Sequence, residues 1–167
     1  EFSTAHPAFS IDEKRLYFAS DRPGSFGYSD IWYVDILEDG EYGDPVNLGP
    51  NINTEFRESF PFISDNNILY FSSDGRMGLG GFDIYYSNLD SYGFPNESKN
   101  FGKPLNSRMD DFGFIYNSKN NFGYFSSNRN GYNGSKSDEV YQFKMLASSA
   151  CGSILSGIVR DKYTGQI

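Results

Sequence analysis

The sequence predicts an all-β protein of repeated four-stranded antiparallel sheets, and three observations support this prediction. Aromatic residues make up 18% of the 167-residue chain and 18 glycines accompany them, a mixture typical of short half-buried strands joined by tight turns. Apolar residues alternate with a period of two, as at Leu16 and Phe18, and no helical period is sustained. A pattern of roughly fifty residues occurs three times.

Each repeat is recognised by an aromatic pair, a glycine-rich loop and a strand that opens on an acid. The aromatic pair is Tyr17-Phe18 in the first repeat and recurs as Tyr70-Phe71 and Tyr124-Phe125. The strand that follows the loop begins with Asp30-Ile31-Trp32, with Asp83-Ile84-Tyr85 and, more loosely, with Glu139-Val140-Tyr141. These coincident registers place the repeats at about 5–54, 58–107 and 110–145.

Four strands are expected in each repeat, in chain order. The first strand is a short apolar segment: HPAFS from His6, FPFIS from Phe60 and FGFIY from Phe112. A polar turn leads to the second strand with its aromatic pair, and the glycine-rich loop leads to the third. In the first repeat, EDGEYGDP carries an Asp-Gly hairpin signal before an edge strand around Val46–Leu48.

A sheet of this kind has two apolar faces and cannot bury both by itself, so such units stack face to face in arrays. A four-stranded meander of roughly fifty residues has the size of a propeller blade, and closed propellers need about four to eight blades. We therefore expect a partial propeller that exposes an aromatic face at each end. Such faces favour association between copies of the chain.

Charge and composition narrow the classes of partner. The chain carries 14 basic and 22 acidic residues, a net charge of −8, and nucleic acids and anionic membrane surfaces require a basic face. No run of about 18 apolar residues occurs, so no membrane insertion by this segment is expected. The single cysteine excludes an internal disulfide framework.

The glycine-rich loop that closes on an acid allows three interpretations. A phosphate cradle would feed a helix N-terminus, whereas this loop feeds a strand. A calcium site would gather several oxygens, and the second loop offers only Asp74 and Asp83. A structural turn needs glycines for positive φ and carboxylates that accept backbone N–H bonds. Recurrence in every repeat favours the structural turn, so neither a metal nor a cofactor is expected.

An arginine recurs beyond the aromatic pair of every repeat. These arginines could line one rim and recognise a carboxylate or an anionic glycan. Alternatively, they pair with the acids that open the third strands or with a neighbouring repeat. The candidate binding residues are therefore the three arginines and the three acids: Arg22, Arg76, Arg129, Asp30, Asp83 and Glu139.

Catalytic residues are not recognised. No Gly-x-Ser-x-Gly elbow occurs, and His6, the only histidine, has no nearby nucleophile. Paired carboxylates are plentiful, but a glycosidase needs two across one cleft, which spacing does not establish. We expect the chain not to be an enzyme. His6 precedes Pro7 at the start of a first strand, where an inter-sheet hydrogen bond is expected.

Pro-x-Phe-Ser, then Leu-Tyr-Phe-x-Ser-Asp-Arg, a glycine-rich loop and Asp-Ile-Tyr form a pattern that resembles the TolB-type, WD-like β-propeller repeat. It spans Pro7–Trp32, Pro61–Tyr85 and, in degenerate form, Gly113–Tyr141. The linking phrases NLGPNINT and NFGKPLNS are similar to repeats of large OmpA-family envelope proteins of the Bacteroidetes type. This resemblance implies a propeller of six blades, of which the chain supplies half.

The tail GSILSGIVRDKYTGQI resembles the first strand and turn of a carboxypeptidase-regulatory-like β-sandwich, with Gly157, Asp161, Thr164 and Gly165 in the matching places. We therefore predict propeller repeats over residues 1–147, and a linker with the first sandwich strand over 148–167. In the OmpA-family proteins that this order resembles, tetratricopeptide repeats precede the propeller and a peptidoglycan-binding domain follows the sandwich.

The resemblance implies a periplasmic, outer-membrane-associated protein. Its propeller would be a non-catalytic scaffold or protein-docking module with protein partners in the cell envelope, linking an outer-membrane type IX secretion assembly to the cell wall. Two alternatives remain open. One is a module that binds glycans or peptidoglycan fragments, with Trp32 and the tyrosine-rich strand faces stacking on sugars. The other is a propeller that gates a hydrolase.

Overall fold

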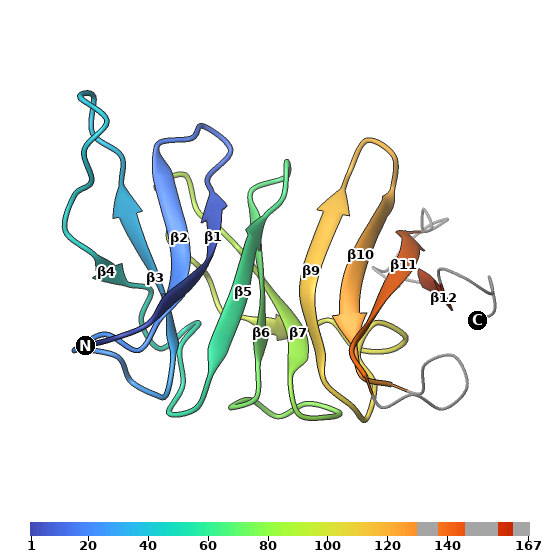
Figure 1. Ribbon diagram of the computed structural model, residues 1–167. Helices are drawn as coiled ribbons and strands as arrows, with labels where there is room; N and C mark the ends of the chain where they lie inside the picture. Colours follow the sequence, from blue (N-terminus) through green and yellow to red (C-terminus); the bar gives the residue numbers. More distant parts are fainter. Residues whose placement is uncertain (130–136, 146–156, 162–167) are drawn as a thin grey trace.

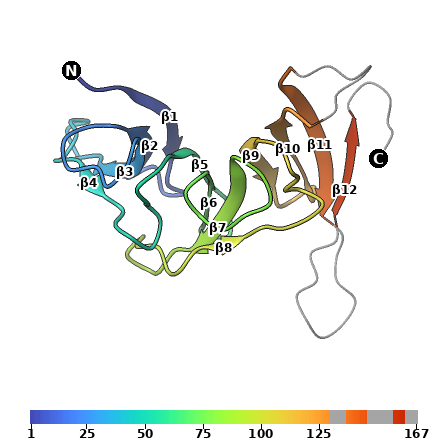
Figure 2. The ribbon, with the colours of Figure 1, turned by 90° about the horizontal axis from the view of Figure 1, so that it is seen from below.

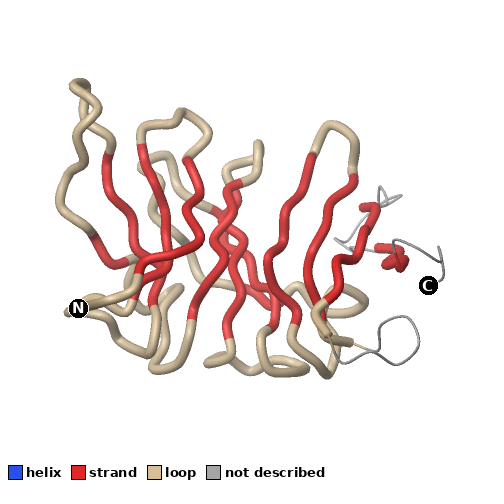
Figure 3. Tube along the Cα trace, viewed as in Figure 1, coloured by secondary structure: helices blue, strands red, loops and turns tan. Residues whose placement is uncertain are grey.

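The computed structural model confirms the all-β class: three antiparallel sheets follow one another along the chain (Figures 1 and 3). The structure describes residues 1–129 and 137–145 and the strand 157–161. Within these residues it contains no helix that could cross a membrane.

Each sheet has four strands, and strands that follow one another in the chain pair side by side. The first sheet contains β1 (Thr4–Phe9), β2 (Arg15–Ser20), β3 (Asp30–Asp35) and β4 (Val46–Asn47). The second contains β5 (Glu58–Ile63), β6 (Ile68–Ser73), β7 (Asp83–Asn88) and β8 (Lys99–Asn100). The third contains β9 (Asp111–Asn117), β10 (Phe122–Ser127), β11 (Glu139–Met145) and β12 (Gly157–Asp161).

The three sheets lie along an arc (Figure 2). The first strands β1, β5 and β9 lie toward the concave side, and β4, β8 and β12 lie toward the outside. This is the arrangement expected of blades around a common axis. The arc is open, with the first and third sheets at its two ends.

Strand β12 takes the place in the third sheet that β4 and β8 take in the other two. It pairs antiparallel with β11, with Asp161 opposite Tyr141 and Gly157 opposite Met145. This strand belongs to the tail that resembles a sandwich domain, whereas Thr164 and Gly165 of the same tail lie outside the described residues. The division of the chain at residue 147 stays a prediction.

Two apolar clusters fill the spaces between the sheets. The first unites Tyr17 and Ile31 of the first sheet with Leu69 and Phe71 of the second. The second unites the second and third sheets, and in it the rings of Tyr70 and Phe114 stack with centroids 4.5 Å apart. Because successive side chains alternate between faces, Tyr17 and Tyr70 face the next sheet along the chain, whereas Phe71 and Phe125 face the preceding one.

Every first strand carries a bulge with a residue in the left-handed region. These residues are His6 (φ 55°), Phe60 (φ 55°) and Gly113 (φ 66°), and each lies where the register shifts. The histidine ring stacks on Phe60 at 3.9 Å, and its buried Nδ1 has no hydrogen-bond partner. The inter-sheet hydrogen bond expected of His6 is therefore wrong, because the bulge directs the imidazole onto an aromatic ring.

Candidate functional site

Each described glycine-rich loop is held by the acid that closes it. Asp30 is fully buried and accepts hydrogen bonds from the backbone N–H groups of Phe26 (2.7 Å) and Gly27 (3.2 Å). The side-chain amide of Asn47 donates a third bond to the same carboxylate at 2.6 Å. This carboxylate acts as the structural-turn interpretation requires.

The second loop repeats this design. Asp83 is fully buried and accepts from the backbone N–H of Leu79 and, at 3.2 Å, from the amide of Asn100. Its Oδ1 is buried with no hydrogen-bond partner, and burial raises the pKa of the Asp83 carboxyl. Because Asp30 and Asp83 are enclosed by their own loops, neither presents a carboxylate to a ligand from solution.

The asparagines of the linking phrases extend this network. Asn53 accepts from the backbone N–H of Ile31 at 2.8 Å and donates to the carbonyl of the same residue at 2.9 Å. Asn106 makes the same two bonds with Ile84. An amide side chain thus pairs with the third strand as a backbone would, just beyond the short fourth strand.

The glycines in the loops permit close contact with the next sheet. A Cβ on Gly27 would lie 2.2 Å from the carbonyl oxygen of Phe56, and one on Gly80 would lie 2.1 Å from that of Met109. The backbone N–H of Tyr28 donates to the Phe56 carbonyl at 2.7 Å across the same contact. The glycine-rich loops therefore join neighbouring sheets.

The second and third recurring arginines contact a neighbouring repeat. Arg76 donates to the carbonyls of Pro50 (3.3 Å) and Asn51 (2.9 Å), in the linker from the first sheet. Arg129 donates to the Pro104 carbonyl (3.0 Å) in the next linker and forms an ion pair with buried Asp111. Of the two structural alternatives for these arginines, contact with a neighbouring repeat is the one observed.

The two remaining site residues predicted from the sequence are Arg22 and Glu139. Arg22 places its guanidinium over the rings of Phe18 (4.7 Å) and Trp32 (5.5 Å). Glu139 opens β11 opposite Ser127, and the loop residues 130–136 before it lie outside the described residues. The three arginines and three acids are thus spread over all three sheets, and no ion pair among the described residues joins one to another.

Large apolar side chains are exposed along the end of the sheets that carries the glycine-rich loops, drawn at the bottom of Figure 1. Met77 is the most exposed, at 98%, and the rings of Tyr28 and Phe56 meet edge to face at 6.4 Å. We call this set the loop rim: Phe26, Tyr28, Phe56, Met77, Leu79 and Met109.

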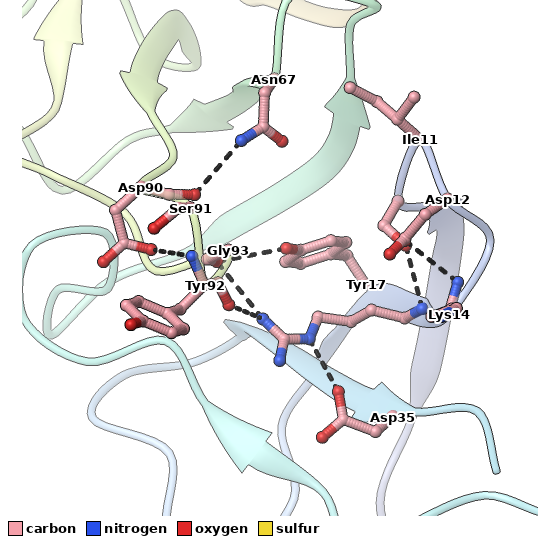
Figure 4. A pocket seen from close by; sticks show the side chains of 12 residues that line it. Ile11, Asp12, Lys14, Tyr17, Asp35, Asn67, Asp90, Ser91, Tyr92 and Gly93 are labelled. Atoms are coloured by element: carbon pink, nitrogen blue, oxygen red, sulfur yellow. Dashed lines mark hydrogen bonds and ion pairs between the residues drawn. The ribbon is translucent and has the colours of Figure 1, made fainter.

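A polar pocket of about 340 Å³ lies at the opposite end, between the first and second sheets (Figure 4). Arg15 crosses its floor, bonded to Asp35 at 2.9 Å and to the carbonyl of Tyr92 at 3.1 Å. Its guanidinium also lies 3.9 Å from the centre of the Tyr33 ring. The hydroxyl of Tyr17 donates to the carbonyl of Gly93, which closes the pocket from the other sheet.

The edge of this pocket offers hydrogen-bonding groups and one exposed ring. Asp12 and Asp90 contribute carboxylates, and a hydrogen bond from the Ser10 hydroxyl lowers the pKa of the Asp12 carboxyl. Tyr92 leaves its ring 77% exposed. Such a set suits a neutral, hydroxyl-rich ligand. Sequence analysis missed the pocket because its walls come from turns about eighty residues apart, which only the stacking of the sheets brings together.

No metal site is formed among the described residues, where no three His, Cys, Asp or Glu side chains gather. Comparison with models of known protein families and with curated proteins finds no match to this chain. The functional argument therefore rests on the fold, on the loop rim and on the polar pocket.

Proposed function

We propose that this chain is part of a β-propeller that serves as a non-catalytic protein-docking scaffold. The observation that supports the proposal is the loop rim, where large apolar side chains are held in solvent. Contiguous exposed apolar side chains mark surfaces that other proteins cover. Methionines such as Met77 and Met109 adapt their shape to a partner and are frequent at such surfaces.

The loops that carry the rim are fixed before any partner arrives. Asp30 and Asp83 hold the backbone of their loops, and the close contacts at Gly27 and Gly80 hold each loop against the next sheet. A surface that is already ordered loses little conformational entropy on binding. The order of these loops before binding therefore favours a preformed docking surface over a surface whose loops fold only on contact with a partner.

The cellular setting of the proposal comes from the resemblance to TolB-type repeats of OmpA-family proteins. On that basis, the scaffold belongs to a periplasmic, outer-membrane-associated protein. It links an outer-membrane assembly of the type IX secretion kind to the cell wall, and its partners are proteins of the envelope.

The test is capture of envelope proteins on the immobilised chain, compared with a variant that carries Met77→Asp and Leu79→Asp. We expect the wild type to retain specific protein subunits, and the variant to retain about tenfold less or lower, because charges at the centre of an apolar contact remain unpaired. Ile11→Asp, at an exposed apolar position on the opposite end, is the control. Equal capture by all three proteins contradicts the proposal.

A glycan-binding module is the second candidate, and the polar pocket is the observation that favours it. Its carboxylates at Asp12 and Asp90 suit sugar hydroxyls, and the Tyr92 ring suits a sugar face. Titration with peptidoglycan fragments, monitored through the NMR signals of the pocket residues, tests the glycan-binding candidate. Saturable shifts that disappear in Tyr92→Ala support this candidate, and unchanged signals exclude it. A gating role beside a hydrolase stays a prediction from sequence.

A further inference from the structure

The three methionines of the chain differ widely in exposure. Met77, in the glycine-rich loop of the second sheet, is 98% exposed, whereas Met145, at the end of β11, is only 9% exposed. Met109 lies between these values at 42%. Peroxides oxidise thioethers, and an exposed thioether reacts before a buried one. The fold therefore predicts the order in which the three sulfur atoms react.

The two exposed methionines belong to neighbouring segments of the loop rim. Met109 lies in the linker between the second and third sheets, and a Cβ on Gly80 would collide with its carbonyl oxygen. Gly80 belongs to the same glycine-rich loop as Met77. Leu79, which is 42% exposed, directly precedes this contact. Both thioethers are therefore part of one apolar surface.

Between the first and second sheets, the same rim is aromatic. Phe56 is the equivalent of Met109, since each lies two residues before the acid that opens a first strand. Their backbone N–H groups make the same hydrogen bond, to the hydroxyl of Thr54 at 3.2 Å and of Ser107 at 3.1 Å. The rings of Phe56 and Tyr28 meet there, and such rings are inert to dilute peroxide. Only the part of the rim that carries Met77 and Met109 is therefore sensitive to oxidation.

The loop holds Met77 in solvent and does not depend on its side chain. The carbonyl of Met77 accepts a hydrogen bond from the hydroxyl of Tyr85 at 3.1 Å. Two residues further on, the N–H of Leu79 donates to the carboxylate of Asp83. The backbone is thus fixed, while the almost fully exposed side chain adds little to the packing of the described residues. Chemistry at the Met77 Sδ therefore alters the surface and leaves the core intact.

We propose that Met77 is a site of reversible oxidation by peroxides, and that its sulfoxide weakens docking at the loop rim. The Sδ atom attacks one oxygen of hydrogen peroxide, the O–O bond breaks, and the other oxygen leaves as water. The sulfur loses two electrons, the peroxide gains them, and the thioether becomes a sulfoxide. The oxidation itself is independent of the proposed docking function, whereas its effect on docking rests on that function.

The sulfoxide weakens docking because it places a strong hydrogen-bond acceptor on an apolar surface. In water this oxygen is hydrated, but under the apolar side chains of a partner it has no donor, and burial of an unpaired polar group is unfavourable. Oxidised methionines disrupt methionine-rich interfaces in this way. We expect binding about tenfold weaker after oxidation. Methionine sulfoxide reductases, which use a dithiol as reductant, restore the thioether.

Mass spectrometry after timed exposure to dilute hydrogen peroxide tests the site. The thiol of Cys151 is alkylated beforehand, so that the thioethers are the groups that react. We expect Met77 to gain one oxygen first, Met109 to follow, and Met145 to react at least about tenfold more slowly than Met77. Circular dichroism checks that the oxidised chain keeps its strands. Oxidation of Met109 or Met145 as fast as that of Met77 overturns the assignment.

Capture of envelope proteins on the immobilised chain tests the effect on docking, with each protein compared with its own untreated form. Peroxide-treated wild type is expected to retain about tenfold less, and reductases with dithiothreitol are expected to restore capture. In Met77→Leu, an apolar side chain without sulfur replaces the thioether, so peroxide should leave its capture unchanged. Met109→Leu is the matched control, and it should stay sensitive because Met77 remains.

Failure of this inference differs from failure of the docking function. Complete oxidation of Met77 with unchanged capture overturns the effect on docking and leaves the docking function standing. An equal loss of capture in peroxide-treated wild type and Met77→Leu also overturns it, because another residue is then responsible. Absence of capture by the untreated chain overturns both the docking function and its control by oxidation, while the order of oxidation still decides whether Met77 is the site.

Discussion

Two asparagine side chains form hydrogen bonds to the third strands as a backbone strand would, at the places where the fourth strands end. Asn53 and Asn106 each donate to and accept from one residue of the third strand, and each also donates to the asparagine of its own linking phrase. All four asparagines recur in the sequence as NLGPNINT and NFGKPLNS. The repetition of these phrases is visible in the sequence, but spacing alone does not show that an amide pairs with a strand, since that depends on how the linker turns back.

Asn106→Ala is expected to lower the free energy of unfolding by about 1–3 kcal/mol, the cost of one unpaired buried polar group. The change leaves the buried backbone N–H of Ile84 without a partner, whereas the carbonyl of Ile84 keeps the hydrogen bond from the N–H of Phe101. Urea denaturation measures the effect, with Asn120→Ala as the control because Asn120 is exposed. A change of the same size in both variants contradicts the account.

Glu58 is a buried acid whose titration should be visible in stability. It is 0% exposed, and burial raises the pKa of its carboxyl above the ordinary 4.5, against hydrogen bonds from Ser73 and Thr54. The folded state therefore holds this proton more tightly than the unfolded state. Its contribution to stability is present below pH 4.5 and is lost as the pH rises through the folded pKa.

Glu58→Gln removes this titration and keeps the shape of the side chain. The difference in unfolding free energy between the variant and the wild type should therefore grow in favour of the variant as the pH rises from about 4 to about 7. Urea denaturation at several pH values measures it, with exposed Glu55→Gln as the control for net charge. A difference that stays constant or shrinks over this range contradicts the pKa direction.

At the scale of the element, the three sheets agree with the repeats found in the sequence. The strand segments and the fourth strand near Val46 were predicted from alternation and turn chemistry, which are local properties. The bulges at His6 and Phe60 were not predicted, because a left-handed histidine or phenylalanine has no local signature. The sequence left open which groups the recurring arginines contact, because those contacts depend on how the neighbouring sheet is placed.

The contact between a glycine-rich loop and the next sheet can be tested at one position. Gly80→Ala would place a Cβ 2.1 Å from the carbonyl of Met109, and we expect it to cost about 1–3 kcal/mol of stability. Gly43→Ala is the control, since its Cβ would meet nothing nearer than 3.6 Å. Thermal unfolding compares the two, and equal midpoints would remove the argument that the loop needs glycine for close approach.

At the scale of the whole molecule, the account depends on the sheets packing face to face. This packing buries Tyr17, Tyr70, Phe71 and Phe125, and it brings distant turns together as the polar pocket. The sequence predicted the stacking from the two apolar faces of each repeat. It did not predict the pocket, because the pocket arises only when the sheets are placed side by side.

The most direct test of this packing is the nuclear Overhauser effect between the rings of Tyr70 and Phe114 in selectively labelled protein. These residues belong to different sheets, and their ring centroids lie 4.5 Å apart. The account predicts strong cross-peaks between the two rings. Cross-peaks confined to pairs within one sheet, such as Phe71 with Tyr85, would show that the sheets do not stack and would contradict it.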